Sequence, residues 1–200
     1  DRILKANQEP QNWLTYSGDL NSQRFSGLTQ ISPANAANLT LQWVFQSRSL
    51  DKHEVTPLVV DGVMYTVQSP NDIIALDAAT GKTIWTYTHK PAEGTRNPCC
   101  GNLTRGVAIL GDKLFLAALD AKMIAIDAKT GTLIWEKVVW DPNAPAAAST
   151  PDQTYPITVA PLIVKDKVII GTAGGDGAIR GFLAGYDAKT GREVWLFYNI

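Results

Sequence analysis

The most reactive residue types in this sequence stand side by side, at Cys99 and Cys100, and they are its only two cysteines. Two interpretations are open: two unrelated buried thiols, or a disulfide between neighbours. A disulfide between neighbours distorts the intervening peptide, so such bonds are strained and uncommon. The residues that flank the pair, Asn97 and Pro98 before it and Gly101 after it, are loop residues that can accommodate this strain.

Composition excludes several kinds of site and partner. Two histidines, His53 and His89, cannot build a multi-histidine metal centre, and one adjacent cysteine pair cannot build a zinc site from cysteine pairs. Eighteen basic and nineteen acidic residues give a formal charge of −1, whereas a nucleic-acid binder normally carries a basic surplus. No apolar run approaches the roughly 20 residues that a membrane helix needs.

A repeated motif indicates the elements that position these residues. Residues 75–85 read ALDAATGKTIW, residues 125–135 read AIDAKTGTLIW, and residues 185–195 read GYDAKTGREVW. In each copy an alternating apolar strand runs into Asp-Ala-x-Thr-Gly, and a second strand ends at a tryptophan. The aspartate can accept hydrogen bonds from turn amides, and the glycine can adopt the positive φ that such a turn requires. The motif therefore predicts a β-hairpin whose final tryptophan packs as an aromatic plug against a neighbouring surface.

A second hairpin precedes each copy of the motif. It spans residues 56–67 with a turn at Asp61-Gly62, residues 105–119 with a turn at Gly111-Asp112, and residues 160–172 with a turn near Lys165-Asp166. Each unit therefore has four short strands, and repeated units of this kind predict an all-β fold, a β-propeller with tryptophan-docking repeats. We expect an N-terminal strand segment over 1–50 and blades at about 51–90, 104–139 and 157–198.

Three units and the preceding strand TLQWVFQ (40–46) cannot close a ring, since propellers have about 4–8 blades. An open arc would leave an exposed sheet face at each end. We therefore expect residues 1–200 to be part of a larger propeller. No signal peptide is visible, because Asp1 begins a polar stretch, which suits a mature secreted chain as well as a cytosolic one.

At the level of sequence the chain resembles the N-terminal part of pyrroloquinoline quinone (PQQ)-dependent alcohol dehydrogenases of the methanol/ethanol family. The stretches that carry the resemblance are 12–45 (NWLTYSGDLNSQRFSGLTQISPANAANLTLQWVF), 54–65 (EVTPLVVDGVMY), 97–108 (NPCCGNLTRGVA) and 155–191, together with the end VWLFYNI. The resemblance implies an eight-bladed propeller with PQQ on its axis and a calcium or lanthanide ion. It also implies a periplasmic location, with the signal peptide already removed, and cytochrome c as the electron acceptor.

The resemblance assigns cofactor-binding roles near the first two blades. Glu54 matches a glutamate that hydrogen-bonds the cofactor, although a surface acid at a strand start is the alternative. Cys99 and Cys100 match a vicinal disulfide that covers one face of the flat quinone. Arg105 matches an arginine that pairs with a cofactor carboxylate, a group that guanidinium recognises bidentately; a solvated salt bridge is the alternative.

Further roles fall near the third blade. Thr158 matches a threonine that contacts a cofactor carboxylate, or it is a structural residue at a strand start. Ala173, Gly174 and Gly175 match a small-residue loop whose backbone amides approach the cofactor. Asp176 stands where the family has a glutamate that ligates the metal, and aspartate is also a hard oxygen donor. The alternative for Asp176 is a turn residue within GGDG.

The implied reaction is oxidation of a primary alcohol to the aldehyde by hydride transfer to metal-bound PQQ. The family's catalytic base has no counterpart in this chain, so no catalytic residue is assigned and we expect the chain to be inactive alone. A non-catalytic propeller scaffold of the outer-membrane assembly type and a PQQ sugar dehydrogenase are the alternatives. The cysteine pair, Glu54 and Arg105 together favour the alcohol dehydrogenase over the scaffold, and by the family resemblance the adjacent cysteines argue against the sugar dehydrogenase.

Overall fold

The computed structural model describes residues 2–95, 101–139, 155–174 and 180–199. These contain two short 3₁₀ helices and twelve strands arranged in three four-stranded sheets. The helices are η1 (Ile3–Gln8) and η2 (Ala36–Asn38). No helix in the described part of the chain is long and apolar enough to cross a membrane.

Each sheet is an antiparallel meander in which the strands follow their order in the chain. The first contains β1 (Leu58–Val60), β2 (Val63–Gln68), β3 (Asp72–Asp77) and β4 (Thr83–Tyr87). The second contains β5 (Ala108–Leu110), β6 (Lys113–Ala117), β7 (Lys122–Asp127) and β8 (Leu133–Val138). The third contains β9 (Leu162–Val164), β10 (Lys167–Gly171), β11 (Phe182–Asp187) and β12 (Glu193–Tyr198).

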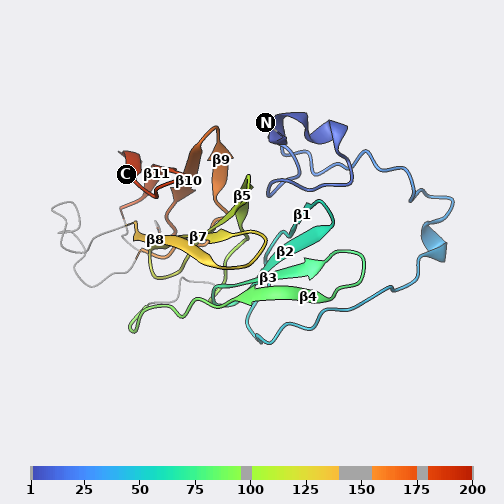
Figure 1. The fold of residues 1–200 in the computed structure, drawn as a ribbon, viewed down its shortest axis with the longest axis horizontal. Helices are drawn as coiled ribbons and strands as arrows, with labels where there is room; N and C mark the ends of the chain where they lie inside the picture. The colour runs from blue at the N-terminus through green and yellow to red at the C-terminus, as the bar shows by residue number, and fades with distance from the viewer. Residues whose placement is uncertain (1, 96–100, 140–154, 175–179, 200) are drawn as a thin grey trace.

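The sheets pack face to face, with the innermost strands β1, β5 and β9 toward one centre (Figure 1). One buried cluster joins the first two sheets and includes Leu58 and Ile73 against Leu114 and Ile126. A second joins the next two sheets through residues such as Phe115 and Met123 of the second sheet and Val168 and Phe182 of the third. A core that lies between successive sheets is the packing of propeller blades. The prediction of a partial β-propeller is confirmed.

The predicted turn chemistry is also confirmed. In the second blade, the Asp127 carboxylate accepts hydrogen bonds from the Thr130 amide (2.7 Å) and hydroxyl (2.9 Å), and Gly131 has a φ of +72°. The same contacts recur at Asp77 and Asp187. These bonds hold the pKa of Asp127 below its usual value, because they favour the charged carboxylate.

The tryptophans of the first two motifs each pack on the motif of the next blade. The Trp85 indole donates to the Ala128 carbonyl (3.2 Å), and a Cβ built on Gly131 would lie 2.7 Å from the Trp85 ring. The Trp135 ring lies against Gly191, where an added Cβ would come 2.9 Å from it, but the buried Trp135 Nε1 has no hydrogen-bond partner among the described residues. The glycine is therefore required twice, for its positive φ and for the close approach of the indole.

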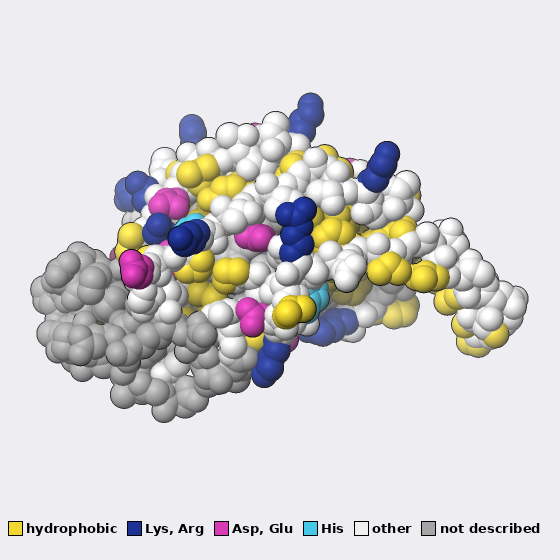
Figure 2. All heavy atoms as spheres, turned by 90° about the horizontal axis from the view of Figure 1, so that it is seen from below, with side chains coloured by type: hydrophobic (Ala, Val, Ile, Leu, Met, Phe, Trp, Pro, Cys, Tyr) yellow, Lys and Arg dark blue, Asp and Glu magenta, His cyan; other side chains and the backbone are white. Residues whose placement is uncertain are grey.

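The expected strand at 40–46 is not formed, and the segment 1–50 contains the two 3₁₀ helices in place of a strand of its own. Trp43 nevertheless occupies a docking position, because its indole donates to the Ala78 carbonyl (3.2 Å) and lies against Gly81. The segment lies along the first blade without a neighbouring strand to pair with. Its apolar side chains Leu41 and Val44 are exposed. The chain around η2 forms an arm that projects from the molecule and carries hydrophobic side chains on its surface (Figures 1 and 2).

Candidate functional site

Three predicted site residues, Glu54, Arg105 and Thr158, come shortly before the innermost strands of the three blades. Backbone hydrogen bonds join their segments from blade to blade. The Thr56 amide donates to the Arg105 carbonyl (3.1 Å), and the Arg105 amide donates to the Thr158 carbonyl (2.9 Å). Residues that are far apart in the sequence are therefore held side by side at one end of the innermost strands.

The side chains of these three residues form one hydrogen-bonded group centred on Arg105. Its Nη2 donates to Glu54 Oε2 at 3.0 Å, and its Nη1 donates to Thr158 Oγ1 at 2.8 Å. Thr158 is buried, whereas the side chains of Arg105 and Glu54 are 38% and 41% exposed. The guanidinium is thus fixed on two sides and accessible on another.

This arrangement leaves hydrogen-bonding capacity for a ligand. An arginine side chain has five N–H donors. Among the described residues, Arg105 uses one to donate to Glu54 and one to donate to Thr158. Thr158 accepts from Arg105, so its own hydroxyl proton can be donated elsewhere. A partly exposed guanidinium with a hydroxyl hydrogen-bonded to it suits an anionic, carboxylate-bearing group.

Gly106 contributes to the site, although the sequence analysis did not single it out. It has a φ of +136°, and a Cβ built there would lie 3.1 Å from the Thr56 carbonyl oxygen. The glycine therefore lets the segment that carries Arg105 approach the backbone that follows Glu54. Its position directly after Arg105 is the only signal in the sequence that pointed to it.

Of the predicted small-residue loop, Ala173 and Gly174 lie within the described residues. The Ala173 amide donates to the Pro156 carbonyl (3.0 Å), so that this amide is already engaged and is not available to a ligand. Gly174 has a φ of +96°, a conformation that suits glycine. Gly175 lies outside the described residues.

The remaining predicted site residues, Cys99, Cys100 and Asp176, also lie outside the described residues. In the part of the chain that the structure describes, no three histidine, cysteine, aspartate or glutamate side chains gather in a way that could hold a metal ion. The site residues that the structure describes are therefore Glu54, Arg105 and Thr158, together with Ala173 and Gly174.

A buried hydrogen-bonded group that the sequence did not predict, His89 with Asp120, lies between the first two blades. Nε2 of His89, after β4, is 3.0 Å from both carboxylate oxygens of Asp120, and both side chains are buried. The Ala92 amide donates to the same carboxylate (3.1 Å). Burial opposes ionisation of Asp120, but the bonds from His89 and Ala92 outweigh it and hold the pKa of Asp120 below its usual value. This group ties β4 to the β6–β7 turn of the next blade.

Comparison with known proteins places these features in one family of domains. Residues 13–200 match the family described as "PQQ: Glucose/ethanol/alcohol dehydrogenase, beta-propeller domain". A quinohemoprotein alcohol dehydrogenase, ADH IIB, of Pseudomonas putida is 42% identical over 199 residues, which are 99% of this chain and 28% of that protein. A 1-butanol dehydrogenase (cytochrome c) of Thauera butanivorans is 40% identical over 88% of this chain and 24% of its own length.

Solved structures agree with the sequence comparison. Quinohemoprotein alcohol dehydrogenase ADHIIG from Pseudomonas putida HK5 superposes with a TM-score of 0.89 and 38% identity, covering 98% of this chain and 28% of that one. A europium-containing methanol dehydrogenase gives a TM-score of 0.88 at 36% identity, covering 99% and 34%. BamB from Moraxella catarrhalis, at a TM-score of 0.55 and 20% identity over 74% of this chain and 41% of that one, shares the fold alone. The chain thus spans about a quarter to a third of the dehydrogenases that it matches.

Proposed function

The chain belongs to the glucose/ethanol/alcohol dehydrogenase β-propeller family, and from this premise we propose that it forms the cofactor-carboxylate end of a PQQ-dependent alcohol dehydrogenase. The whole protein oxidises a primary alcohol to the aldehyde and passes the electrons to a cytochrome c. The names of relatives that are quinohemoprotein or cytochrome c-linked alcohol dehydrogenases support this reaction and this acceptor. The same resemblance supports a periplasmic location.

The single observation that carries the proposal is the hydrogen-bonded group of Glu54, Arg105 and Thr158. PQQ carries three carboxylates, and the described residues fit such a group. The Arg105 guanidinium is oriented by its two neighbours before any ligand arrives, which lowers the entropic cost of binding a carboxylate. A propeller that serves only as a scaffold has no need for a partly exposed arginine that is fixed in this way.

We assign a separate role to each residue of this group. Arg105 binds a cofactor carboxylate through its open N–H groups, Thr158 donates its hydroxyl proton to the same end of the cofactor, and Glu54 orients Arg105 and accepts a hydrogen bond from the cofactor. Ala173 and Gly174 contact the cofactor through atoms other than the Ala173 amide, because this amide already donates to the Pro156 carbonyl. When bound, the quinone supplies the electron-accepting carbonyl.

For the site residues outside the described part of the chain, we propose the roles that the resemblance implies. Cys99 and Cys100 form a vicinal disulfide, a rigid apolar ledge against one face of the planar cofactor. Gly175 lies in the cofactor-binding loop, and Asp176 is the ligand from this chain to a calcium or lanthanide ion, both of which prefer hard oxygen donors. The europium-containing relative supports a metal ion beside the cofactor. The catalytic base lies elsewhere in the whole protein.

The test uses the full-length protein, purified without cofactor and titrated with PQQ in the presence of Ca²⁺ or La³⁺. We expect stoichiometric PQQ retention that requires the metal, and oxidation of ethanol or 1-butanol with an artificial electron acceptor. A parallel titration with glucose as the substrate separates the alcohol dehydrogenase from the sugar dehydrogenase. If the protein does not retain PQQ with either metal, the proposal is wrong.

A further inference from the structure

We propose that residues 2–20, which we call the axial plug, close the end of the propeller's central channel opposite the Arg105 site. The site would then open to solvent at one end of the axis only. This inference deepens the proposed function, since it describes the closed side of the same cofactor chamber, and it rests on that function for the identity of the chamber.

The axial plug and the site lie at opposite ends of the same three strands. Glu54, Arg105 and Thr158 precede β1, β5 and β9, whereas the plug contacts the residues with which these strands end and turn. Between the plug and the strand ends lies an apolar cavity of about 510 Å³, which residues of all three described blades help to line. Its walls include Ile3, Leu4, Leu14 and Leu20 of the plug, and Val60, Ile109, Leu110, Ile163 and Val164 of the strands.

The plug is attached to the inner edge of the first blade. The Trp13 amide donates to the Val59 carbonyl (2.7 Å), and the Val59 amide donates to the Trp13 carbonyl (3.0 Å). Because β1 is the innermost strand, this pairing places the chain on the side that faces the axis. Leu14 is buried in the core between the first two blades, and Ile3 packs against both inter-blade cores. The plug therefore bridges all three blades.

A cluster of charges fastens the start of the plug to the turn that follows β1. The Arg2 guanidinium donates to both oxygens of Asp61, at 2.7 and 2.8 Å, and its Nε donates to Glu9 at 3.0 Å. Asn12 joins the group, because its Nδ2 donates to Glu9 (2.8 Å) and its Oδ1 accepts from the Asp61 amide (2.9 Å). The hydrogen bonds with Arg2 hold the pKa of Asp61 below its usual value. A bidentate arginine within a network gives a defined geometry.

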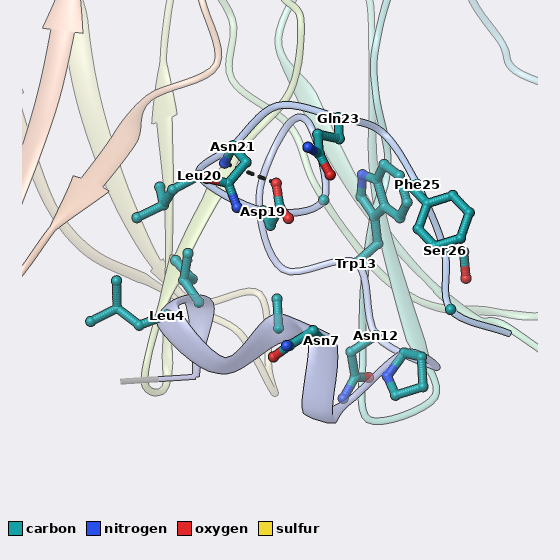
Figure 3. Close-up of a pocket in the computed structure, with 15 residues that line it drawn as sticks. Leu4, Asn7, Asn12, Trp13, Asp19, Leu20, Asn21, Gln23, Phe25 and Ser26 are labelled. Carbon is teal, nitrogen blue, oxygen red and sulfur yellow. Dashed lines mark hydrogen bonds between the residues drawn. The ribbon is translucent and has the colours of Figure 1, made fainter.

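The plug also has internal structure that continues into the following loop. Helix η1 and the chain up to Gly27 enclose a second cavity of about 520 Å³, with the Trp13 ring in its wall and Leu4 and Leu20 together on another side (Figure 3). Gly18 lies on the Trp13 ring, where a Cβ would come within 3.0 Å. The Trp13 Nε1 is buried and has no hydrogen-bond partner among the described residues. The plug is thus a folded segment built around Trp13.

The experiment measures access to the cavity in the full-length protein, first without cofactor. Leu110→Cys places a thiol on the cavity wall, and its maleimide labelling is followed by peptide mass spectrometry, which separates it from Cys99 and Cys100. The labelling rate reports the population in which the plug is open. We expect Arg2→Ala to raise this rate about two- to fivefold, the range for a partly exposed ionic network. Ile3→Asp, which brings a charge against both cores, should raise it about tenfold or more.

Lys5→Ala is the matched control, because Lys5 lies on the same helix, is exposed, and lines neither cavity. Its labelling rate should equal that of the Leu110→Cys parent. Thermal unfolding checks that each variant is folded. Equal labelling rates in the parent and in both Arg2→Ala and Ile3→Asp would overturn the plug. A protein that retains no PQQ would still show the difference in labelling, so a failure of the proposed function is distinguishable from a failure of the plug.

Discussion

At the scale of single residues, the site depends on how Arg105 is held. A free arginine side chain on a surface loses much rotamer entropy when it binds a ligand. Here Thr158 and Glu54 restrict the guanidinium before binding, at 2.8 and 3.0 Å. Arg105 therefore serves as a rigid donor, and its replacement should affect affinity more than its exposure alone suggests.

We expect Arg105→Ala in the full-length protein to weaken PQQ binding about 10- to 100-fold, the effect of losing a charge-assisted hydrogen bond. Arg105→Lys should restore part of the affinity, since lysine keeps the charge but not the planar fork. The measurement is a PQQ titration at fixed metal concentration. Arg192→Ala, which removes an exposed arginine from the hairpin before β12, is the control and should leave affinity unchanged. Unchanged affinity in Arg105→Ala would remove this residue from the site.

We also expect Cys99 and Cys100 to be joined in the native protein. Alkylation under denaturing, non-reducing conditions should modify neither cysteine, and reduction should expose both. Because an adjacent disulfide forms a rigid ledge, the double variant Cys99→Ser/Cys100→Ser should bind PQQ more weakly than the parent. Two thiols that react without reduction would contradict the disulfide.

At the scale of the elements, the tryptophan hairpins join one blade to the next. We expect Gly131→Ala to lower the free energy of unfolding by about 2–3 kcal/mol, because it adds a side chain at positive φ and a contact 2.7 Å from the Trp85 ring. Gly111→Ala is the matched control, with a φ of +58° and open space around the added Cβ. It should cost about 1 kcal/mol. Denaturant unfolding measures both, and equal losses would show that the indole contact adds nothing.

The hydrogen bonds between His89 and Asp120, which also join the first two blades, make the stability of the fold depend on pH. The pKa of Asp120 is lower in the folded chain than in the unfolded one, so its contribution is present above the usual aspartate pKa and is lost as the pH falls through the folded-state value. Asp120→Asn should lower the free energy of unfolding by about 1–3 kcal/mol at pH 7. It should also flatten the fall in stability below about pH 4. The check is denaturant unfolding across this pH range, and an unchanged pH profile would contradict it.

At the scale of the whole molecule, the first and third sheets each have an outer face that no other sheet of the described residues covers. Trp195 is 38% exposed, although its counterparts Trp85 and Trp135 pack on the blades that follow them. At the other end, Trp43 is docked on the first blade, while the chain around it pairs with no strand in the described structure. Both ends therefore present surfaces that further blades would cover.

We accordingly expect residues 40–46 and β12 to be protected from hydrogen exchange in the full-length protein. In residues 1–200 expressed alone, residues 40–46 should exchange about 100-fold faster or more, because amides without a partner strand open readily. β12 keeps its pairing with β11 and should exchange faster only because the face of its sheet is uncovered. The isolated chain should also self-associate through its unpaired edges. Exchange of 40–46 that is equally fast in both proteins would show that this segment does not complete a blade.

The sequence by itself determined the hairpins, because their contacts are local. Asp127 reaches an amide and a hydroxyl three residues away, so the motif Asp-Ala-x-Thr-Gly already specifies its turn. The alternation of apolar residues and the recurring tryptophans then predicted blades. Four-stranded units repeated in this way have few alternatives to a propeller. The same local rules predicted a strand at 40–46, which failed because a strand also needs a neighbour.

Only the tertiary structure decided which distant residues meet. Arg105 lies 51 residues from Glu54 and 53 from Thr158, and His89 lies 31 residues from Asp120. Their contacts depend on how the blades stack, which no local pattern encodes. The resemblance proposed Glu54, Arg105 and Thr158 as site residues, but their mutual orientation came from the backbone bonds between blades. The axial plug has the same origin, since Arg2 and Asp61 meet only when the N-terminal segment folds back across the innermost strands.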